Sequence, residues 1–342
     1  MIHRCIRLFR LNGSKALSVC GLILCLVIAE NPMLRASENP APEAQSPLPR
    51  LPSNTIRVST YLVTVPVFVT DASGRAIRGM KIGDFRITED GESQTIARIA
   101  EANEVPLRLG LLFDLSGSLN SLFEFEQQAA IRFLHRVWKD GDSVCVVAFS
   151  DQPHIVLKRS IFISEVLEEL SKLRPTEKAT AFLDSVVVTA HFLVQSAKPD
   201  TRRAMVVLTD GADNRSDHSL IDTIAEVQSS DTIFYSINPS AASVRLNEIN
   251  IKGQENLASL AAATGGTAFI SGRAEDLDDI FNRIAVELRA QYLLAYYSSN
   301  PLLDGSFRKI KVTVPNRQDL DVRARQGYYA VPKKTKPYPK LD

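Results

Sequence analysis

Between about residues 105 and 290, strand-like apolar runs alternate with stretches in which apolar residues have helical spacing. The strand-like runs are Leu107–Phe113, Ser143–Phe149, Ala204–Asp210, Thr232–Ile237 and Thr267–Ile270. Helices are expected at about Leu122–Lys139, Ile163–Leu173, Phe182–Gln195 and Asp276–Ala290. Continuous apolar runs joined by helices are typical of a parallel sheet covered on both faces. The region therefore predicts a doubly wound, mostly parallel α/β sheet, with the polar-alternating stretch His154–Arg159 at its edge.

Polar side chains follow two of these runs at the point where each strand is expected to end. The first run ends at Asp114, and Ser116 and Ser118 follow at every second position. A later run ends at Asp210, which is followed by Gly211. Open α/β sheets bind ligands in the crevice at the carboxyl ends of their strands. Carboxylate and hydroxyl oxygens gathered at this edge favour a hard divalent cation.

Thr180 lies between these two motifs, on the loop that precedes the helix expected from Phe182. Together with two serines and two aspartates, its hydroxyl can contribute to octahedral oxygen coordination once waters and one outside ligand complete it. Each motif also has a purely structural explanation. The serines can cap the following helix, Asp210-Gly211 can form a strand-end turn, and Thr180 can start a helix.

The same residues resemble a known site. Asp114-Leu-Ser-Gly-Ser118, Thr180 and Asp210-Gly211 are similar to the three-part metal-ion-dependent adhesion site of von Willebrand factor type A (VWFA) domains. The resemblance covers about residues 105 to 290, and it implies a Rossmann-like domain. One departure is that the family usually has glycines before the threonine, whereas Lys178 and Ala179 stand here.

The resemblance implies one divalent cation, usually Mg²⁺, with Mn²⁺ or Ca²⁺ as alternatives. Its metal site would consist of Asp114, Ser116, Ser118, Thr180 and Asp210. The expected partner is a protein that supplies an Asp or Glu carboxylate to the open coordination position. A cation held mainly by neutral hydroxyls keeps excess positive charge, which attracts such a carboxylate. The formal net charge of +1 gives no indication of a nucleic-acid partner, and no small-molecule substrate is expected.

Two β-rich segments flank the α/β region, at residues 55–104 and 291–330. Pro66 predicts an edge position or a bulge for the first strand. Asp84–Gly91 predicts a short strand that enters an Asp-Gly turn, with Ser93–Ala100 as its hairpin partner. Neither set of strands can close a core alone. We therefore expect the two segments to form one β-sandwich-like domain into which the VWFA domain (105–290) is inserted. Asp84–Gly91 and Glu287–Tyr296 also resemble the flanks of a bacterial exported subgroup of the family.

The two ends of the chain lie outside these domains. Residues 1–29 combine four basic residues with a short apolar stretch, which predicts a signal peptide, with an uncleaved membrane anchor as the alternative. Six prolines within residues 30–54 predict an extended linker, and residues 331–342 predict a disordered tail. Three of the four cysteines fall in the signal region, and Cys145 is expected in a buried strand as a small hydrophobe. These features predict export to the periplasm, the cell surface or the medium.

The sequence as a whole predicts an exported, non-enzymatic adhesion-type module that captures a partner carboxylate through a metal ion. A scaffold or assembly protein with a purely structural ion is the alternative, and a metal-dependent hydrolase is a further one. Enzyme signatures are missing from the sequence: it has no Gly-x-Ser-x-Gly elbow, no phosphate-binding loop and no dinucleotide-binding glycine motif. His218 follows Asp210 closely and is expected to be a solvated loop histidine.

Overall fold

The computed structural model describes residues 62–116, 123–176, 178–195, 201–239, 248–271, 273 and 276–330. The predicted signal peptide, linker and C-terminal tail lie outside these residues, as does Ser118. Within the described ranges, every helix is too short or too polar to span a lipid bilayer.

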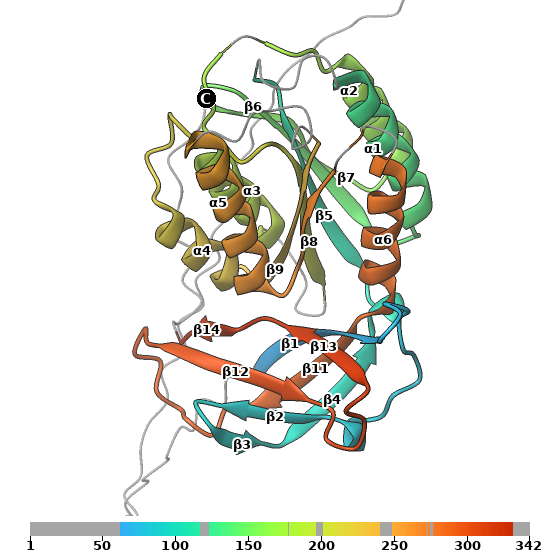
Figure 1. The fold of residues 1–342 in the computed structure, drawn as a ribbon, viewed down its shortest axis with the longest axis vertical. Coiled ribbons are helices and arrows are strands. Elements are labelled where there is room, and N and C mark those ends of the chain that lie inside the picture. The colour runs from blue at the N-terminus through green and yellow to red at the C-terminus, as the bar shows by residue number, and fades with distance from the viewer. Residues whose placement is uncertain are drawn as a thin grey trace, which may run out of the picture. The chain divides into compact units, whose positions relative to one another are not determined.

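The central sheet has six strands in the order β10-β9-β8-β5-β6-β7 (Figure 1). Their bounds are β5 Leu107–Asp114, β6 Ser143–Phe149, β7 Pro153–Ser160, β8 Arg202–Leu208, β9 Thr232–Asn238 and β10 Ala268–Ile270. Every neighbouring pair is parallel except β6 and β7, which are antiparallel. The prediction of a mostly parallel sheet with the His154–Arg159 stretch at its edge is confirmed.

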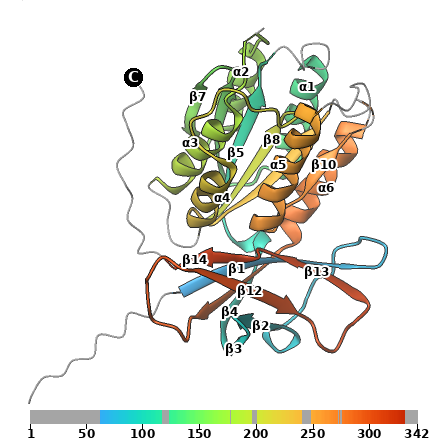
Figure 2. The same ribbon diagram turned by 60° about the vertical axis from the view of Figure 1, so that its left-hand side comes forward.

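Helices cover both faces of this sheet, as Figures 1 and 2 show. One face packs against α1 Phe123–Val137, α2 Ile163–Lys172 and α6 Leu277–Ala290, and the other against α3 Phe182–Val194, α4 Leu220–Ser229 and α5 Glu248–Thr264. The first core contains Phe133, Val166 and Phe281, and the second contains Phe182 and Leu257. Helix α1 buries residues at intervals of three and four, which explains why its core face could be read from the sequence.

The flanking segments form two four-stranded antiparallel sheets that share one core. Each sheet mixes strands from before and after the α/β region, in the orders β13-β1-β11-β4 and β14-β12-β2-β3. The strands are β1 Leu62–Asp71, β2 Arg86–Glu89, β3 Glu92–Gln94, β4 Ile96–Glu101, β11 Tyr292–Tyr297, β12 Phe307–Thr313, β13 Leu320–Ala324 and β14 Gly327–Tyr329, with short 3₁₀ helices η1 Ile82–Asp84 and η2 Ala102–Glu104. Val65 and Leu294 from one sheet and Ile87 and Ile310 from the other belong to the same buried cluster. The predicted β-sandwich built from both flanks is therefore confirmed.

Two details of the flank prediction are wrong. Ser93–Ala100 is not one hairpin strand, because β3 ends at Gln94 and pairs with β2, whereas β4 begins at Ile96 and pairs with β11 in the other sheet. The Asp90-Gly91 turn, in which both residues have positive φ, fixes only the short β2–β3 hairpin. The chain then crosses between the sheets, because both are needed to enclose the core.

The position of Pro66 is the second correction. Strand β1 is internal to its sheet, with β11 on one side and β13 on the other. Pro66 is nevertheless tolerated because it pairs with Leu293 of β11, while the pairing with β13 begins only at Val67. The proline thus occupies the part of the strand that has a single neighbour, where a missing N–H disrupts no second ladder.

The β-sandwich core encloses an ion pair between Glu89 and Arg308. Glu89 and Arg308 are 2% and 1% exposed. The Glu89 carboxylate accepts hydrogen bonds from the hydroxyls of Tyr296 (2.6 Å), Ser298 (2.6 Å) and Tyr328 (3.0 Å), and Arg308 Nη1 lies 3.3 Å from it. Arg308 Nη1 also donates to the carbonyl of Asn300 at 2.7 Å. The ion pair is therefore held by a network that satisfies most of its polar atoms.

Candidate metal centre

The two strands that carry the predicted aspartates are neighbours. Phe113 of β5 pairs in register with Leu208 of β8, so Asp114 and Asp210 lie at adjacent strand tips on one edge of the sheet. The two residues are 1% and 7% exposed. The expected convergence of these strand ends is confirmed.

Hydrogen bonds fix the Asp114 carboxylate on both oxygens. Oδ1 accepts from the backbone N–H of Ser116 at 2.9 Å, and Oδ2 accepts from the Thr209 hydroxyl at 2.7 Å. The Thr209 hydroxyl in turn accepts from the N–H of Gly211 at 3.0 Å. Thr209 thus orients Asp114 from the neighbouring strand, a role that the sequence analysis missed. Its position just before Asp210 was the available signal.

Gly211 makes the turn after β8 possible. Its φ is +80°, and a Cβ at this position would lie 2.4 Å from the carbonyl oxygen of Gly253 in α5. Only glycine combines that left-handed conformation with such a close backbone approach. The turn brings the N–H of Ala212 to Asp210 Oδ1 at 3.0 Å, which holds the second carboxylate at the strand tip.

The Thr180 loop is attached to the same turn. The N–H of Thr180 donates to Asn214 Oδ1 at 3.0 Å, and its carbonyl accepts from the N–H of Asn214 at 3.1 Å. On the other side, the N–H of Ala181 donates to the carbonyl of Ser150, just after β6, at 2.6 Å. Thr180 is therefore docked between the ends of two strands and is 6% exposed.

The structure gathers four of the five predicted ligands at one edge of the sheet, Asp114 at the end of β5 and the other three in loops. Asp114, Ser116, Thr180 and Asp210 are all less than a tenth exposed, and the fifth, Ser118, lies outside the described residues. In the described ranges, no three His, Cys, Asp or Glu side chains are placed as a metal-binding group. Cation binding by this set would thus rely on hydroxyl oxygens as well as the carboxylates.

A glutamate that the sequence analysis did not select lies close to this group. Glu126, in the first turn of α1, is 0% exposed, and within the described ranges neither of its carboxylate oxygens has a hydrogen-bond partner. Burial raises its pKa to about 8, and the charges of Asp114 and Asp210 add to the effect. Burial likewise raises the pKa of Asp114 to about 6, although hydrogen bonds from Ser116 and Thr209 oppose the shift. An acidic residue on the apolar face of a predicted helix was the signal for Glu126.

These pKa shifts predict that the metal-free protein loses stability as the pH rises. A carboxyl whose pKa is higher in the folded than in the unfolded chain stabilises the folded state while it is protonated. For Asp114 and Glu126 this stabilisation is complete below the unfolded pKa values of 3.8 and 4.5. It is lost as the pH rises towards the folded values of about 6 and 8. In EDTA, the free energy of unfolding should fall by about 2 kcal/mol or more across this range, because a tenfold change in proton affinity corresponds to about 1.4 kcal/mol. Denaturant titrations at several pH values measure this. A free energy of unfolding that does not change with pH in EDTA would contradict this prediction.

Other candidate groups have different surroundings. His218 Nδ1 lies 2.7 Å from Asp184 Oδ1, and its side chain is 37% exposed, as expected for a loop histidine. Cys145 is buried in β6, and burial raises the pKa of its thiol to about 12.

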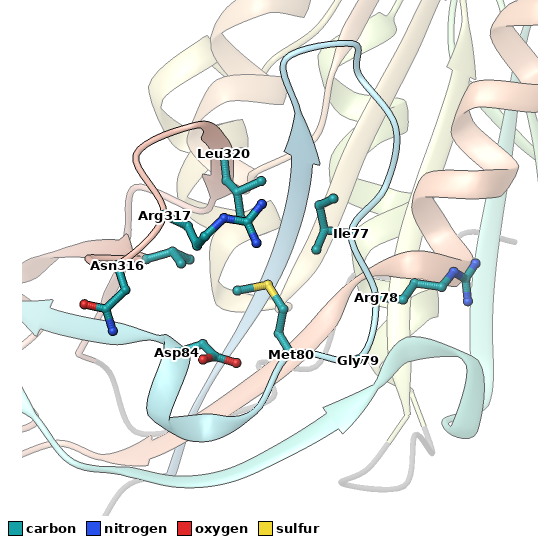
Figure 3. A pocket seen from close by; sticks show the side chains of 9 residues that line it. Ile77, Arg78, Gly79, Met80, Asp84, Asn316, Arg317 and Leu320 are labelled. Carbon is teal, nitrogen blue, oxygen red and sulfur yellow. The ribbon is translucent and has the colours of Figure 1, made fainter.

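A pocket of 240 Å³ lies in the β-sandwich and shares no residue with the site (Figure 3). Met80, Leu320 and Asp84 line it, and the Arg78 side chain points away from the others. Two of its charged groups have partners: Arg317 donates two hydrogen bonds of 2.8 Å to Asp319, and Asp84 accepts from the N–H of Lys81 at 2.7 Å.

Comparisons with known proteins identify the α/β region. A family model described as von Willebrand factor type A domain matches residues 109–283, just over half of the chain. A search of curated protein sequences finds no match.

Several solved structures resemble the chain at low sequence identity. BatB from Bacteroides thetaiotaomicron is 12% identical with a TM-score of 0.41, over 53% of this chain and 98% of that one. The PilB minor pilin from Streptococcus sanguinis is 15% identical with a TM-score of 0.43, over 54% and 62%. Proximal thread matrix protein 1 from the mussel byssus, solved with a zinc-occupied MIDAS motif, is 17% identical with a TM-score of 0.46, over 57% and 48%. The chain thus spans about three-fifths of the pilin and half of the byssus protein.

Proposed function

The chain belongs to the von Willebrand factor type A domain family, and on that premise we propose that it binds a protein partner through a divalent cation. The cation, most simply Mg²⁺, would be held by Asp114, Ser116, Ser118, Thr180 and Asp210. The partner would supply an Asp or Glu carboxylate to the remaining coordination position. Members of this family generally act as interaction modules, which supports a binding role without catalysis.

The chemistry of the donor set fits such an ion. Carboxylate and hydroxyl oxygens are the ligands that Mg²⁺ and Ca²⁺ prefer, and Mg²⁺ usually keeps several waters. The observation that carries the proposal is that four of these residues are buried at one edge of the sheet. Hydrogen bonds hold them there, from Ser116 and Thr209 to Asp114 and between Thr180 and Asn214. A few buried polar side chains that converge at one edge of a sheet are typical of a ligand-binding site.

Each group has a definite task in this proposal. The bound cation would supply a positive centre for the incoming carboxylate. Asp114 and Asp210 would balance part of its charge, and the serine and threonine hydroxyls would complete the coordination without adding negative charge. Thr209 would keep the Asp114 carboxylate in one orientation, in the way that outer hydrogen-bond partners orient metal ligands.

The remaining elements of the proposal concern export and domain division. We propose that residues 1–29 direct export, that 30–54 form a linker and that 331–342 form a tail. The VWFA domain at 105–290 would then be carried outside the cytoplasm on the β domain formed by 55–104 and 291–330. An exported chain could meet partners at the cell surface or in the periplasm.

A capture experiment tests the proposed function. The immobilised wild-type chain should retain its partner from an extract of the producing cell envelope in Mg²⁺ and release it in EDTA. Thr180→Ala should retain less of the partner, because one neutral ligand is lost. Asp151→Ala, which alters a half-exposed carboxylate just after β6, is the matched control and should behave as wild type.

Two other results would favour the alternatives. If EDTA lowers the melting temperature but leaves capture unchanged, the ion is structural and the chain is a scaffold. If the Mg²⁺-loaded chain turns over model phosphate or acyl esters, it is a hydrolase. Either result would contradict the proposed capture through a metal-bound carboxylate.

A further inference from the structure

Helix α1 directs a carboxylate into the core at the edge of the sheet that carries the candidate site. Its buried face includes Ala130, Phe133 and Val137, which pack against β5 in one cluster. Glu126 precedes Ala130 by four residues and Phe133 by seven, so it lies on this same face, one turn nearer to the start of the helix. Glu124, two residues earlier, is exposed.

The described surroundings of Glu126 do not offset the cost of burying its carboxylate. The residue is 0% exposed, and neither oxygen has a hydrogen-bond partner among the residues that the structure describes. Of the charged side chains in the described part of the chain, Asp114 and Asp210 act on it, and both carry negative charge. A desolvated carboxylate with only negative neighbours is strongly unfavourable, and it persists where a proton or a cation compensates it.

We propose that Glu126 is a third acidic group of the cation site, which faces the ion from the α1 side and accepts a hydrogen bond from water bound to it. The inference rests on the proposed function, because it requires a cation at Asp114 and Asp210. The three carboxylates do not form a direct ligand cluster in the described residues, which is why the contact is assigned through water. Mg²⁺ in particular retains coordinated waters that can donate to such an acceptor.

This role would set both the affinity and the charge of the site. A third carboxylate strengthens the attraction for the cation before any partner arrives. It also lowers the residual positive charge that a partner carboxylate would meet. The site would then hold its ion firmly and bind the partner reversibly.

The test compares Glu126→Gln with the matched control Glu124→Gln, an exposed glutamate of the same helix turn. Glutamine keeps the size of the side chain and removes the charge. We expect Glu126→Gln to weaken Mg²⁺ and Mn²⁺ binding by about tenfold or more, the usual effect of losing an outer partner of a metal site. The rise in melting temperature at a fixed cation concentration should shrink accordingly. Glu124→Gln should match wild type in both measurements.

The outcomes separate the role of Glu126 from the proposed function. An unchanged cation response in Glu126→Gln, whatever its stability in EDTA, would overturn the inference and indicate a buried protonated acid. A wild-type chain that responds to no divalent cation would overturn the proposed function together with the inference. If Glu126→Gln cannot be obtained folded, Glu126→Asp repeats the test, because its shorter reach should weaken cation binding although the charge remains.

Discussion

Replacing Asp114 with alanine should abolish the stabilisation that Mg²⁺ gives to the wild-type chain. Asp114 lies at the tip of β5, is 1% exposed, and has both carboxylate oxygens fixed by Ser116 and Thr209. Its removal takes away one of the two proposed acidic ligands and frees Ser116 and Thr209 from their common acceptor. The rise in melting temperature between EDTA and excess Mg²⁺ should therefore fall to zero in this variant.

Asp151→Ala is the control for this measurement. Asp151 follows β6 and pairs with Lys178 at 3.3 Å, but it is not one of the proposed ligands. Its variant should keep the full Mg²⁺-induced rise. If Asp114→Ala also keeps that rise, Asp114 does not belong to the cation site.

The second large effect is expected in the β-sandwich. Arg308→Met should lower the free energy of unfolding by about 3–5 kcal/mol, because it leaves the Glu89 carboxylate as a buried charge without its cationic partner. The guanidinium also donates to the carbonyls of Asn300 and Leu302, which would lose these bonds. Denaturant unfolding monitored by circular dichroism measures the change.

The neighbouring residue of β12 provides the matched control. Lys309 is exposed, whereas Arg308 is 1% exposed, so Lys309→Met should change stability by only about 0.5 kcal/mol or less. The double variant Arg308→Met with Glu89→Gln should recover part of the loss, since the unpaired charge is removed. If the Arg308 and Lys309 substitutions lower the free energy of unfolding equally, the buried ion pair does not stabilise the fold more than an exposed lysine does.

The inner strands of the central sheet were predictable because they are continuous apolar runs. Strands β5, β6, β8 and β9 are buried along almost their whole length, as expected for inner parallel strands, whereas β10 and β7 at the ends of the sheet are only partly buried. The polar residues that interrupt the runs then mark the strand tips, which is how Asp114 and Asp210 could be placed at one edge. Topology confirmed that step, because β5 and β8 are neighbours.

The sequence indicated less about polar groups whose position depends on tertiary packing. The position of Glu126 on the apolar face of a predicted helix was a signal in the sequence, but its complete burial follows from the packing of α1 on the sheet. Arg308 occupies the same alternating face as Ile310 and Val312, yet its partner Glu89 is more than two hundred residues away. Such distant pairs become visible only when both flanks meet in one core.

The crossing of the chain between the two sheets was hidden for a similar reason. Residues 92–101 have a uniform β pattern, and the break at Thr95 carries no glycine or proline. The break is imposed by the need to place β3 beside β2 and β4 beside β11. Local pattern does not contain that information.

Anomalous diffraction from crystals of the wild-type chain grown with Mn²⁺ tests the cation site most directly. One strong manganese peak should lie at the edge of the sheet, surrounded by oxygens of Asp114, Ser116, Ser118, Thr180 and Asp210. The absence of a peak there at saturating Mn²⁺, or a peak bounded by other residues, would contradict the proposal that this cluster holds a divalent cation.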